Sequence, residues 1–486
     1  MDDDLCYLPA TEALARFGTR ELSPVELLDA VIARAEAVEP VVNALCHRFF
    51  DEALEQARVA EARYAGRGEP PRPLEGIPVA VKEEEAIAGQ PWTLGSLIHR
   101  DTIAEETTPF ARRMIDAGAI IHARSTAPEF SVAGFTRSRL WGVTRNPWNP
   151  EYSPGGSSGG SAAALASGTA TLASGSDIGG SIRIPASFCG VVGFKPPYGR
   201  VPVAPPDNLD TYCHCGPLAR TVADCALYEN VLAGPEPTDI TTLRPRLVLP
   251  ATPAGVSGLR VALSVDLGDW PVDADVRANT LAAADALRAA GALVEEVGLA
   301  IPRADVMRAA AIHYQAGFGA WIAEQCMRHP EDVTAYAPDF VRWCAQLADG
   351  GSHLDGLEIE ARLYPPLGDV LERYDALLCP TNGTRGLLAD EEYVENRLEV
   401  AGETVGFYEE GLMTAPFNVL SRCPVLSVPS GIADNGVPTG VQIVGRTFDD
   451  VTVFALGAAL ARESPWLDVP ARRPGPAAQW LRPRPT

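Results

Sequence analysis

The sequence has little positive charge for its size, which argues against two classes of partner. Its 486 residues include 40 Lys and Arg against 63 Asp and Glu, so the formal net charge is −23 at pH 7. Nucleic acids and anionic membranes are bound by clustered Lys and Arg. We therefore expect neither a nucleic-acid nor a membrane partner, and we interpret the acidity as favouring solubility.

Long hydrophobic runs and paired cysteine motifs are also missing. No segment approaches the roughly 18 apolar residues of a membrane helix, and MDDDLCYLPATEALARFG lacks the basic and apolar regions of a secretory signal. Ten cysteines are scattered without a Cys-x-x-Cys pair, which is typical of reduced thiols. These absences predict a cytoplasmic protein.

Nothing in the sequence indicates a metal or a cofactor. The one candidate is Cys213-His214-Cys215, but adjacent residues rarely converge on a single ion. We interpret these three side chains as part of a pocket wall, and we predict no metal and no cofactor.

What the sequence does contain is a regular alternation of helical and strand patterns. A capping box with Pro at the first helical position, Ser23-Pro24-Val25-Glu26, begins one helix. Further helices are expected over about 51–64, 109–118, 159–167, 221–233 and 274–290, and strands over 76–82, 119–124, 169–174, 259–265, 292–297, 374–380, 425–428 and 437–444. This alternation predicts an α/β fold with a large mixed sheet. A helical insertion over about 303–372 could shape a substrate pocket.

Two glycine-rich turns that carry serine are the most informative feature. GGSSGG at 155–160 and DIGGS at 177–181 flank an Ala-rich segment. Glycine lets the backbone approach a ligand closely, and N–H groups in such turns can stabilise an oxyanion. A flexible linker is the alternative, but the ordered apolar spacing between the turns disfavours it.

The first turn also matches the Gly-x-Ser-x-Gly pattern of α/β-hydrolases. That pattern needs a strand directly before the serine, and here Pro147, Pro150 and Pro154 precede it. Such a hydrolase also needs a histidine later in the chain; His214, His313, His329 and His353 are formally possible, and the last 133 residues contain none. A phosphate-binding loop is excluded because no Lys-Ser or Lys-Thr follows the glycines.

Lys82 ends an apolar strand and offers a route without histidine. A buried lysine is a base because low dielectric disfavours its ammonium form, and it can activate a serine. The alternative is a structural lysine in an ion pair, because Glu83, Glu84 and Glu85 follow directly. The local sequence leaves both interpretations open.

Together these segments resemble the amidase signature family along nearly the whole chain. The resemblance rests on LEGIPVAVKE (74–83), WGVTRNPWN (141–149), YSPGGSSGGSAAALASG (152–168), SDIGGSIRIPASFCGVVGFKPPYGR (176–200), GPLARTVAD (216–224), YDALLCPT (374–381), FNVLSRCPVLSVPSG (417–431) and GVPTGVQIVGR (436–446). The chain is similar to bacterial aryl acylamidases, nylon-oligomer cyclic dimer hydrolases and urethane-hydrolysing amidases. The family implies one large domain over 1–486, with a mixed twisted sheet covered on both faces by helices. Its expected parts are N-terminal helices (1–65), a catalytic core (about 66–235) and the helical insertion.

The resemblance also implies roles for individual residues. Ser181 would be the nucleophile, and Ser157, which in this family follows a cis peptide bond, would connect it to Lys82. The spacing of 24 residues between the two serines agrees with the family and selects Ser157 over Ser158.

The family further implies where substrate would be held. The oxyanion hole would consist of the N–H groups of Ile178, Gly179, Gly180 and Ser181, and the turn Ser131-Val132-Ala133 would face the scissile group. Departures from the family pattern are Glu83, Ser176 and Pro197, of which Glu83 affects the expected placement of a carboxylate beside Lys82. We interpret Asp177 and Arg183 as a structural charge pair.

The expected function is hydrolysis of a carbon–nitrogen bond in a small molecule, an amide, an anilide or a carbamate (urethane), with water as second substrate and esters as side substrates. Aromatic residues in the variable regions suit either an apolar substrate or core packing: Phe135, Trp141, Tyr198, Tyr212, Trp321 and Trp343. The alternatives are a glutamine-hydrolysing amidotransferase A-type subunit with partner subunits, and a non-catalytic binding relative. The sequence does not decide the oligomeric state; a homodimer is the assembly we consider.

Overall fold

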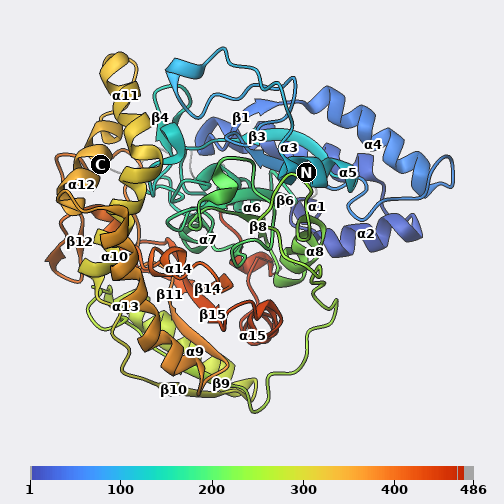
Figure 1. The fold of residues 1–486 in the computed structure, drawn as a ribbon. Coiled ribbons are helices and arrows are strands. Elements are labelled where there is room, and N and C mark those ends of the chain that lie inside the picture. The colour runs from blue at the N-terminus through green and yellow to red at the C-terminus, as the bar shows by residue number, and fades with distance from the viewer. Residues whose placement is uncertain (1–2, 468, 476–486) are drawn as a thin grey trace, which may run out of the picture.

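The computed structural model describes residues 3–467 and 469–475 and contains one large mixed sheet (Figure 1). In spatial order its strands are β1 (Leu45–Arg48), β3 (Ile120–Ser125), β2 (Pro78–Lys82), β6 (Leu172–Asp177), β8 (His214–Ala219), β7 (Val192–Lys195), β14 (Val425–Ile432), β15 (Pro438–Gly445), β11 (Ala376–Pro380), β9 (Arg260–Leu263) and β10 (Leu293–Glu296). Two small pairs lie outside it: β4 (Arg137–Ser138) with β5 (Gly142–Val143), and β12 (Glu399–Val400) with β13 (Glu403–Thr404).

The sheet combines parallel and antiparallel pairing. Strand β2 lies between β3 and β6 and is parallel to both. The strands from β6 through β11 pair antiparallel, and β9 is parallel to β10 and β11. The predicted α/β class with a mixed sheet is therefore confirmed.

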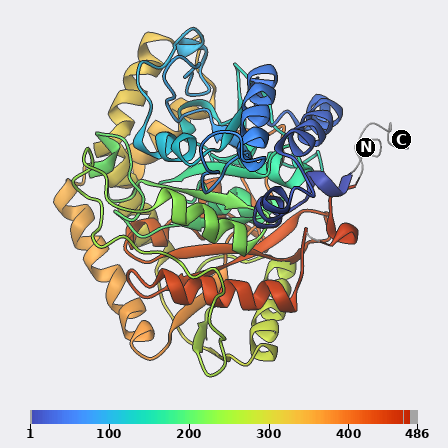
Figure 2. The same ribbon diagram turned by 90° about the vertical axis from the view of Figure 1, so that its right-hand side faces the viewer.

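Helices cover both faces of this sheet (Figures 1 and 2). Outside the insertion they are α1 (Asp3–Cys6), α2 (Ala10–Thr19), α3 (Pro24–Val42), α4 (Phe50–Tyr64), α5 (Pro109–Asp116), α6 (Gly159–Ser167), α7 (Arg183–Cys189), α8 (Val222–Leu232), α9 (Ala274–Ala289), α14 (Pro416–Val419) and α15 (Asp450–Glu463). The predicted capping box is present: the Ser23 hydroxyl accepts from the Glu26 N–H at 3.2 Å, and the Glu26 carboxylate accepts from the Ser23 N–H at 2.8 Å. No helix among the described residues is both long and apolar enough to cross a membrane.

Residues 303–371 form a helical layer at one edge of the molecule (Figure 1, yellow to orange). It comprises α10 (Arg303–Tyr314), a π-helical turn (Gln315–Gly319), α11 (Ala320–Arg328), α12 (Tyr336–Ala348) and α13 (His353–Leu371). The rings of Phe318 and Phe340 stack between these helices, with centroids 5.9 Å apart. Aromatic packing therefore holds these helices against one another.

One strand begins and ends later than its sequence pattern predicts. Gly168 ends α6 in the left-handed region at φ 78°, and the N–H of Thr169 still bonds the carbonyl of Ala164 at 2.8 Å. The strand expected over 169–174 is therefore β6, Leu172–Asp177. This shift places Ser176 inside the strand and makes Asp177 its last residue, directly before the second serine turn.

Candidate active site

Lys82 is the last residue of β2, and its side chain is completely buried in the centre of the sheet. Its Nζ lies 2.7 Å from Ser157 Oγ, 2.8 Å from Ser176 Oγ and 2.9 Å from Glu84 Oε1. The lysine therefore contacts the first serine turn, strand β6 and one carboxylate at once.

These three contacts suit both protonation states of Lys82. An ammonium has three donors and no acceptor, so it would donate to Ser157, Ser176 and Glu84. A neutral amine has two N–H donors and one lone pair. Since a carboxylate only accepts, the amine would donate to Glu84 and Ser176 and could accept the proton of Ser157.

Of the three consecutive glutamates, only Glu84 places its carboxylate against Lys82 Nζ. Glu83 Oε2 instead accepts from the Thr93 hydroxyl at 2.6 Å, and Glu85 Oε2 accepts from the Thr108 hydroxyl at 2.8 Å. The expectation that Glu83 would be the carboxylate beside Lys82 was wrong. The residues after β2 form a turn, so the strand alternation of side chains does not continue past Lys82.

Electrostatics separates the same three carboxylates. Burial raises the pKa of both Glu83 and Glu85. Burial also acts to raise the pKa of Glu84, but the attraction of Lys82 and hydrogen bonds from Ser131 and Ser176 outweigh it and hold that pKa below its usual range. Glu84 is therefore the one carboxylate of the run that is held as an anion next to the lysine.

The first serine turn contains a cis peptide bond between Gly156 and Ser157. A Cβ atom on Gly156 would lie 2.4 Å from the Ala133 carbonyl oxygen and 2.6 Å from that of Phe135. Only glycine can occupy this position, because the backbone of 133–135 passes directly against it.

The two serine turns meet in space. The N–H of Ser158 donates to the carbonyl of Ser181 at 3.1 Å. The carbonyl of Ile178 accepts from the Tyr314 hydroxyl at 3.2 Å, and the carbonyl of Gly179 accepts from the Thr414 hydroxyl at 2.7 Å. Hydroxyl groups from two distant parts of the chain thus fix two carbonyls of the second turn.

The N–H groups of the second turn remain available. Within residues 3–467 and 469–475, no group accepts a hydrogen bond from the N–H of Gly179, Gly180 or Ser181. Buried N–H groups are normally paired, so donors free beside Ser181 suit the binding of an oxyanion.

Asp177 and Arg183 flank this turn in the sequence and form an ion pair with an N–O distance of 2.8 Å. Both side chains are fully buried. Asp177 Oδ2 also accepts from the N–H of Ile182 at 3.2 Å, and Asn418 donates to Oδ1 at 2.8 Å. Burial alone would raise the pKa of Asp177, but Arg183 and these hydrogen bonds lower it to about 2. The predicted structural charge pair is confirmed.

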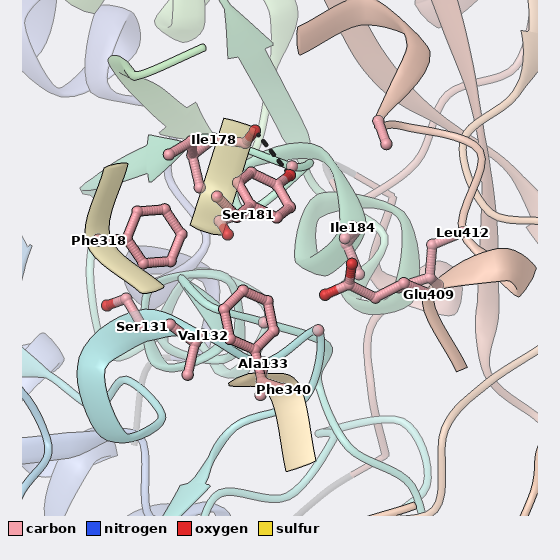
Figure 3. A pocket seen from close by; sticks show the side chains of 15 residues that line it. Ser131, Val132, Ala133, Ile178, Ser181, Ile184, Phe318, Phe340, Glu409 and Leu412 are labelled. Atoms are coloured by element: carbon pink, nitrogen blue, oxygen red, sulfur yellow. Dashed lines mark hydrogen bonds between the residues drawn. The ribbon is translucent and has the colours of Figure 1, made fainter. Parts of the chain in front are cut away.

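Ser181 opens into a pocket (Figure 3). The predicted turn Ser131-Val132-Ala133 lines this pocket together with Ser181, and Ile178 and Gly179 line it as well. The remaining lining residues are Gly134, Gly156, Ile184, Tyr314, Phe318, Phe340, Glu409, Leu412 and Ala415.

The aromatic wall of the pocket comes from the helical layer of residues 303–371, which contributes Tyr314, Phe318 and Phe340. None of the six aromatic residues named from the sequence belongs to the lining of this pocket. Phe135, Tyr212 and Trp343 are instead core residues, and Tyr198 lines a second, smaller hollow with Cys213, His214 and Cys215. The interpretation of those last three residues as a pocket wall is confirmed.

Sequence reasoning missed several residues of the site. Ser176 and Glu84 contact Lys82, and Glu409 lines the pocket. Ser176 carries a recognisable signal, because it alternates with Ser174 on a strand that precedes the second serine turn. Glu409 has none, because it lies in a short 3₁₀ turn (Tyr408–Gly411) far along the chain.

Comparison with known proteins now identifies the family. The family model described as Amidase matches residues 26–454. The chain belongs to the amidase family. It is an enzyme of the amide-hydrolase class, and its fold is the amidase signature fold.

Individual relatives agree with this assignment. Over 500 aligned residues the chain is 33% identical to the A subunit of the glutamyl-tRNA(Gln) amidotransferase of Moorella thermoacetica, covering 95% of this chain and 97% of that protein. A bacterial aryl acylamidase structure of the amidase signature family superposes with a TM-score of 0.88 at 30% identity, covering 96% of this amidase and 99% of that chain. The 6-aminohexanoate cyclic dimer hydrolase structure gives a TM-score of 0.81 at 29% identity, covering 96% and 99%.

Proposed function

We propose that this amidase hydrolyses non-peptide carbon–nitrogen bonds of small molecules through an acyl-enzyme on Ser181. Ser181 Oγ attacks the carbonyl carbon, and its proton passes to Ser157 while Ser157 passes its own proton to Lys82. The Lys82 ammonium then returns a proton along the same path to the departing amine. Water then attacks the acyl-enzyme and gives a proton through Ser157 to Lys82. That proton is returned to Ser181 Oγ as the acid departs.

The observation that carries this proposal is the 2.7 Å contact between Lys82 Nζ and Ser157 Oγ inside a fully buried site. A base must lie within hydrogen-bond reach of the proton that it accepts. The Ser158-to-Ser181 backbone bond keeps the two serine turns together. The N–H groups of Ile178, Gly179 and Gly180 are the proposed oxyanion donors, each typically worth about 3–4 kcal/mol to the transition state.

The proposed substrates are amides, anilides and carbamates, with esters as easier acyl donors. The pocket wall of Tyr314, Phe318, Phe340 and Ile184 favours an apolar or aromatic group beside the scissile carbonyl. A carbamate would give a carbamoyl-enzyme whose hydrolysis releases carbon dioxide. No step of this chemistry requires a group beyond the protein and water.

A panel of chromogenic anilides, esters and carbamates, tested on the purified protein, examines this function. We expect release of amine or alcohol without any partner, and trapping of the acyl group on the Ser181 peptide by mass spectrometry. Absence of turnover on all three classes, or full turnover by Ser181→Ala, would overturn the proposal.

An amidotransferase A-type subunit is the second candidate, favoured by relatives of 31–34% identity over most of the chain. Glutamine, however, carries a carboxylate, and no Lys or Arg is among the residues that line the described pocket. We therefore favour the free amidase. Glutaminase activity that appears only with added partner subunits would reverse this preference.

We also propose a cytoplasmic location. All ten cysteines are free thiols in this structure. Cysteine-rich proteins outside the cell usually form disulfides, so reduced cysteines favour the cytoplasm. Fractionation of the native host, with detection of the protein in the soluble cytosolic fraction, tests this location.

A further inference from the structure

One charged side chain lies in the otherwise apolar pocket. Glu409 extends from the turn Tyr408–Gly411 and its carboxylate points into the pocket, opposite Phe318 (Figure 3). Ser181 lies across the same pocket. A carboxylate here therefore faces whatever group of the substrate extends beyond the scissile bond.

This carboxylate is poorly satisfied by the protein. Its one hydrogen-bond partner in the described chain is the Tyr408 hydroxyl, at a long 3.4 Å from Oε1, and that hydroxyl also accepts from the Gly134 N–H at 3.1 Å. No cation of the described chain acts on Glu409. A carboxylate has about four acceptor sites, so most of its hydrogen-bonding capacity is directed at the pocket.

The titratable groups around Glu409 supply no positive charge. They are Tyr408 on its own turn, Tyr314 on α10 and Cys344 on α12. Burial raises the pKa of all three, the strongest cause in each case, so each is neutral at pH 7. A partly buried carboxylate with a single long hydrogen bond is costly, and a structural role alone would be served by a neutral side chain.

We propose that Glu409 is the subsite for an ammonium group of the substrate. This inference rests on the proposed function and narrows its substrate class to amides or esters that carry a basic amine a few bonds from the scissile carbonyl. The ammonium pairs with the Glu409 carboxylate, and the rings of Tyr314 and Phe340 provide faces to which a cation is attracted.

The subsite is pH-dependent in a defined direction. Burial raises the pKa of Glu409 to about 7. Below that pH the free side chain is a neutral acid and the pocket suits uncharged substrates. Above it the carboxylate is charged, and preference for an ammonium substrate increases.

Matched substrates test the subsite. We would measure kcat/KM for pairs that share a scissile bond and a chain and differ only in a terminal ammonium or a terminal methyl group. One series carries this group in the acyl part and the other in the leaving group. In one of the series we expect the wild type to prefer the ammonium member, and the preference ratio to fall about ten- to hundredfold in Glu409→Gln, the range typical of a charge-assisted hydrogen bond.

Glu410→Gln is the matched control, because Glu410 lies in the same turn but faces Arg303, with an N–O distance of 3.6 Å. Its preference ratio should stay that of the wild type. A wild type without preference in either series, or a preference that persists in Glu409→Gln, overturns the subsite. Because the methyl members report hydrolysis without the ammonium, their turnover separates failure of the subsite from failure of the proposed function.

Discussion

Glu84 Oε1 lies 2.9 Å from Lys82 Nζ, and the hydroxyl of Ser131 donates to the other oxygen of the same carboxylate. Ser131 lines the same pocket as Ser181. Glu84 thus connects the proposed base to the loop that lines this pocket. In the proposed mechanism its negative charge would stabilise the Lys82 ammonium that forms as the acyl-enzyme is made.

Glu84→Gln should therefore lower kcat, because the ammonium that Lys82 would become during acylation loses its anionic partner. Steady-state kinetics with a chromogenic ester measures the loss. Glu83→Gln is the control, since Glu83 contacts Thr93 instead. An unchanged kcat in Glu84→Gln, or an equal loss in both variants, contradicts this role.

Alanine substitutions should separate the proposed relay from its neighbours. Ser181→Ala should abolish turnover, and Lys82→Ala and Ser157→Ala should each lower kcat by several orders of magnitude, because the proton route is broken. Ser158→Ala is the matched control, because within the described chain its hydroxyl makes a single hydrogen bond, to the Ser176 carbonyl at 3.4 Å. Steady-state kinetics with a chromogenic ester measures all four. Equal losses in Ser157→Ala and Ser158→Ala would refute the selection of Ser157.

The buried Asp177–Arg183 pair should contribute strongly to the stability of the fold. Asp177→Asn leaves Arg183 charged and buried, a change that typically costs about 3–5 kcal/mol of unfolding free energy. Asp390→Asn, in an exposed pair with Arg145, should cost about 0–1 kcal/mol. Urea unfolding at pH 7 compares the two variants, and similar losses would contradict the assignment.

The same carboxylate predicts a pH window. The folded-state pKa of Asp177, about 2, lies below the unfolded value of roughly 3.9. Its stabilisation is therefore complete above the unfolded pKa and is lost as the pH falls from about 4 through about 2. The wild type should lose stability over this range more steeply than Asp177→Asn, whereas parallel curves would argue against it.

Gly179 and Tyr314 offer a test of the oxyanion turn by paired substitution. A Cβ atom on Gly179 would lie 2.7 Å from the Tyr314 hydroxyl oxygen but 3.8 Å from its ring carbon Cζ. Gly179→Ala should displace the turn and lower kcat, by up to the roughly 10²–10³-fold loss typical of one oxyanion donor. The double variant Gly179→Ala/Tyr314→Phe removes the clashing oxygen and should recover part of that loss. No recovery would show that the turn is held by other contacts.

Local sequence patterns predicted much of this architecture. The Ser23 capping box, the apolar strand that ends at Lys82 and the Ala-rich helix between the serine turns all appear where their spacing indicates. These features depend on hydrogen bonds and alternation within a few residues, so a short segment contains the information. The shift of β6 by three residues shows where such local prediction fails. The C-cap at Gly168 prolongs the end of the helix, so the strand begins later.

The sequence by itself determined the fold class, the family and the candidate residues Lys82, Ser157 and Ser181. Only the tertiary structure decided which of three adjacent glutamates contacts the lysine, and that Tyr314, Phe318, Phe340 and Glu409 line the pocket. The pocket brings Ser181 together with Glu409, which lies more than 200 residues later in the chain. Such contacts depend on how the insertion and the Tyr408–Gly411 turn pack against the sheet, and no local pattern of residues encodes that packing.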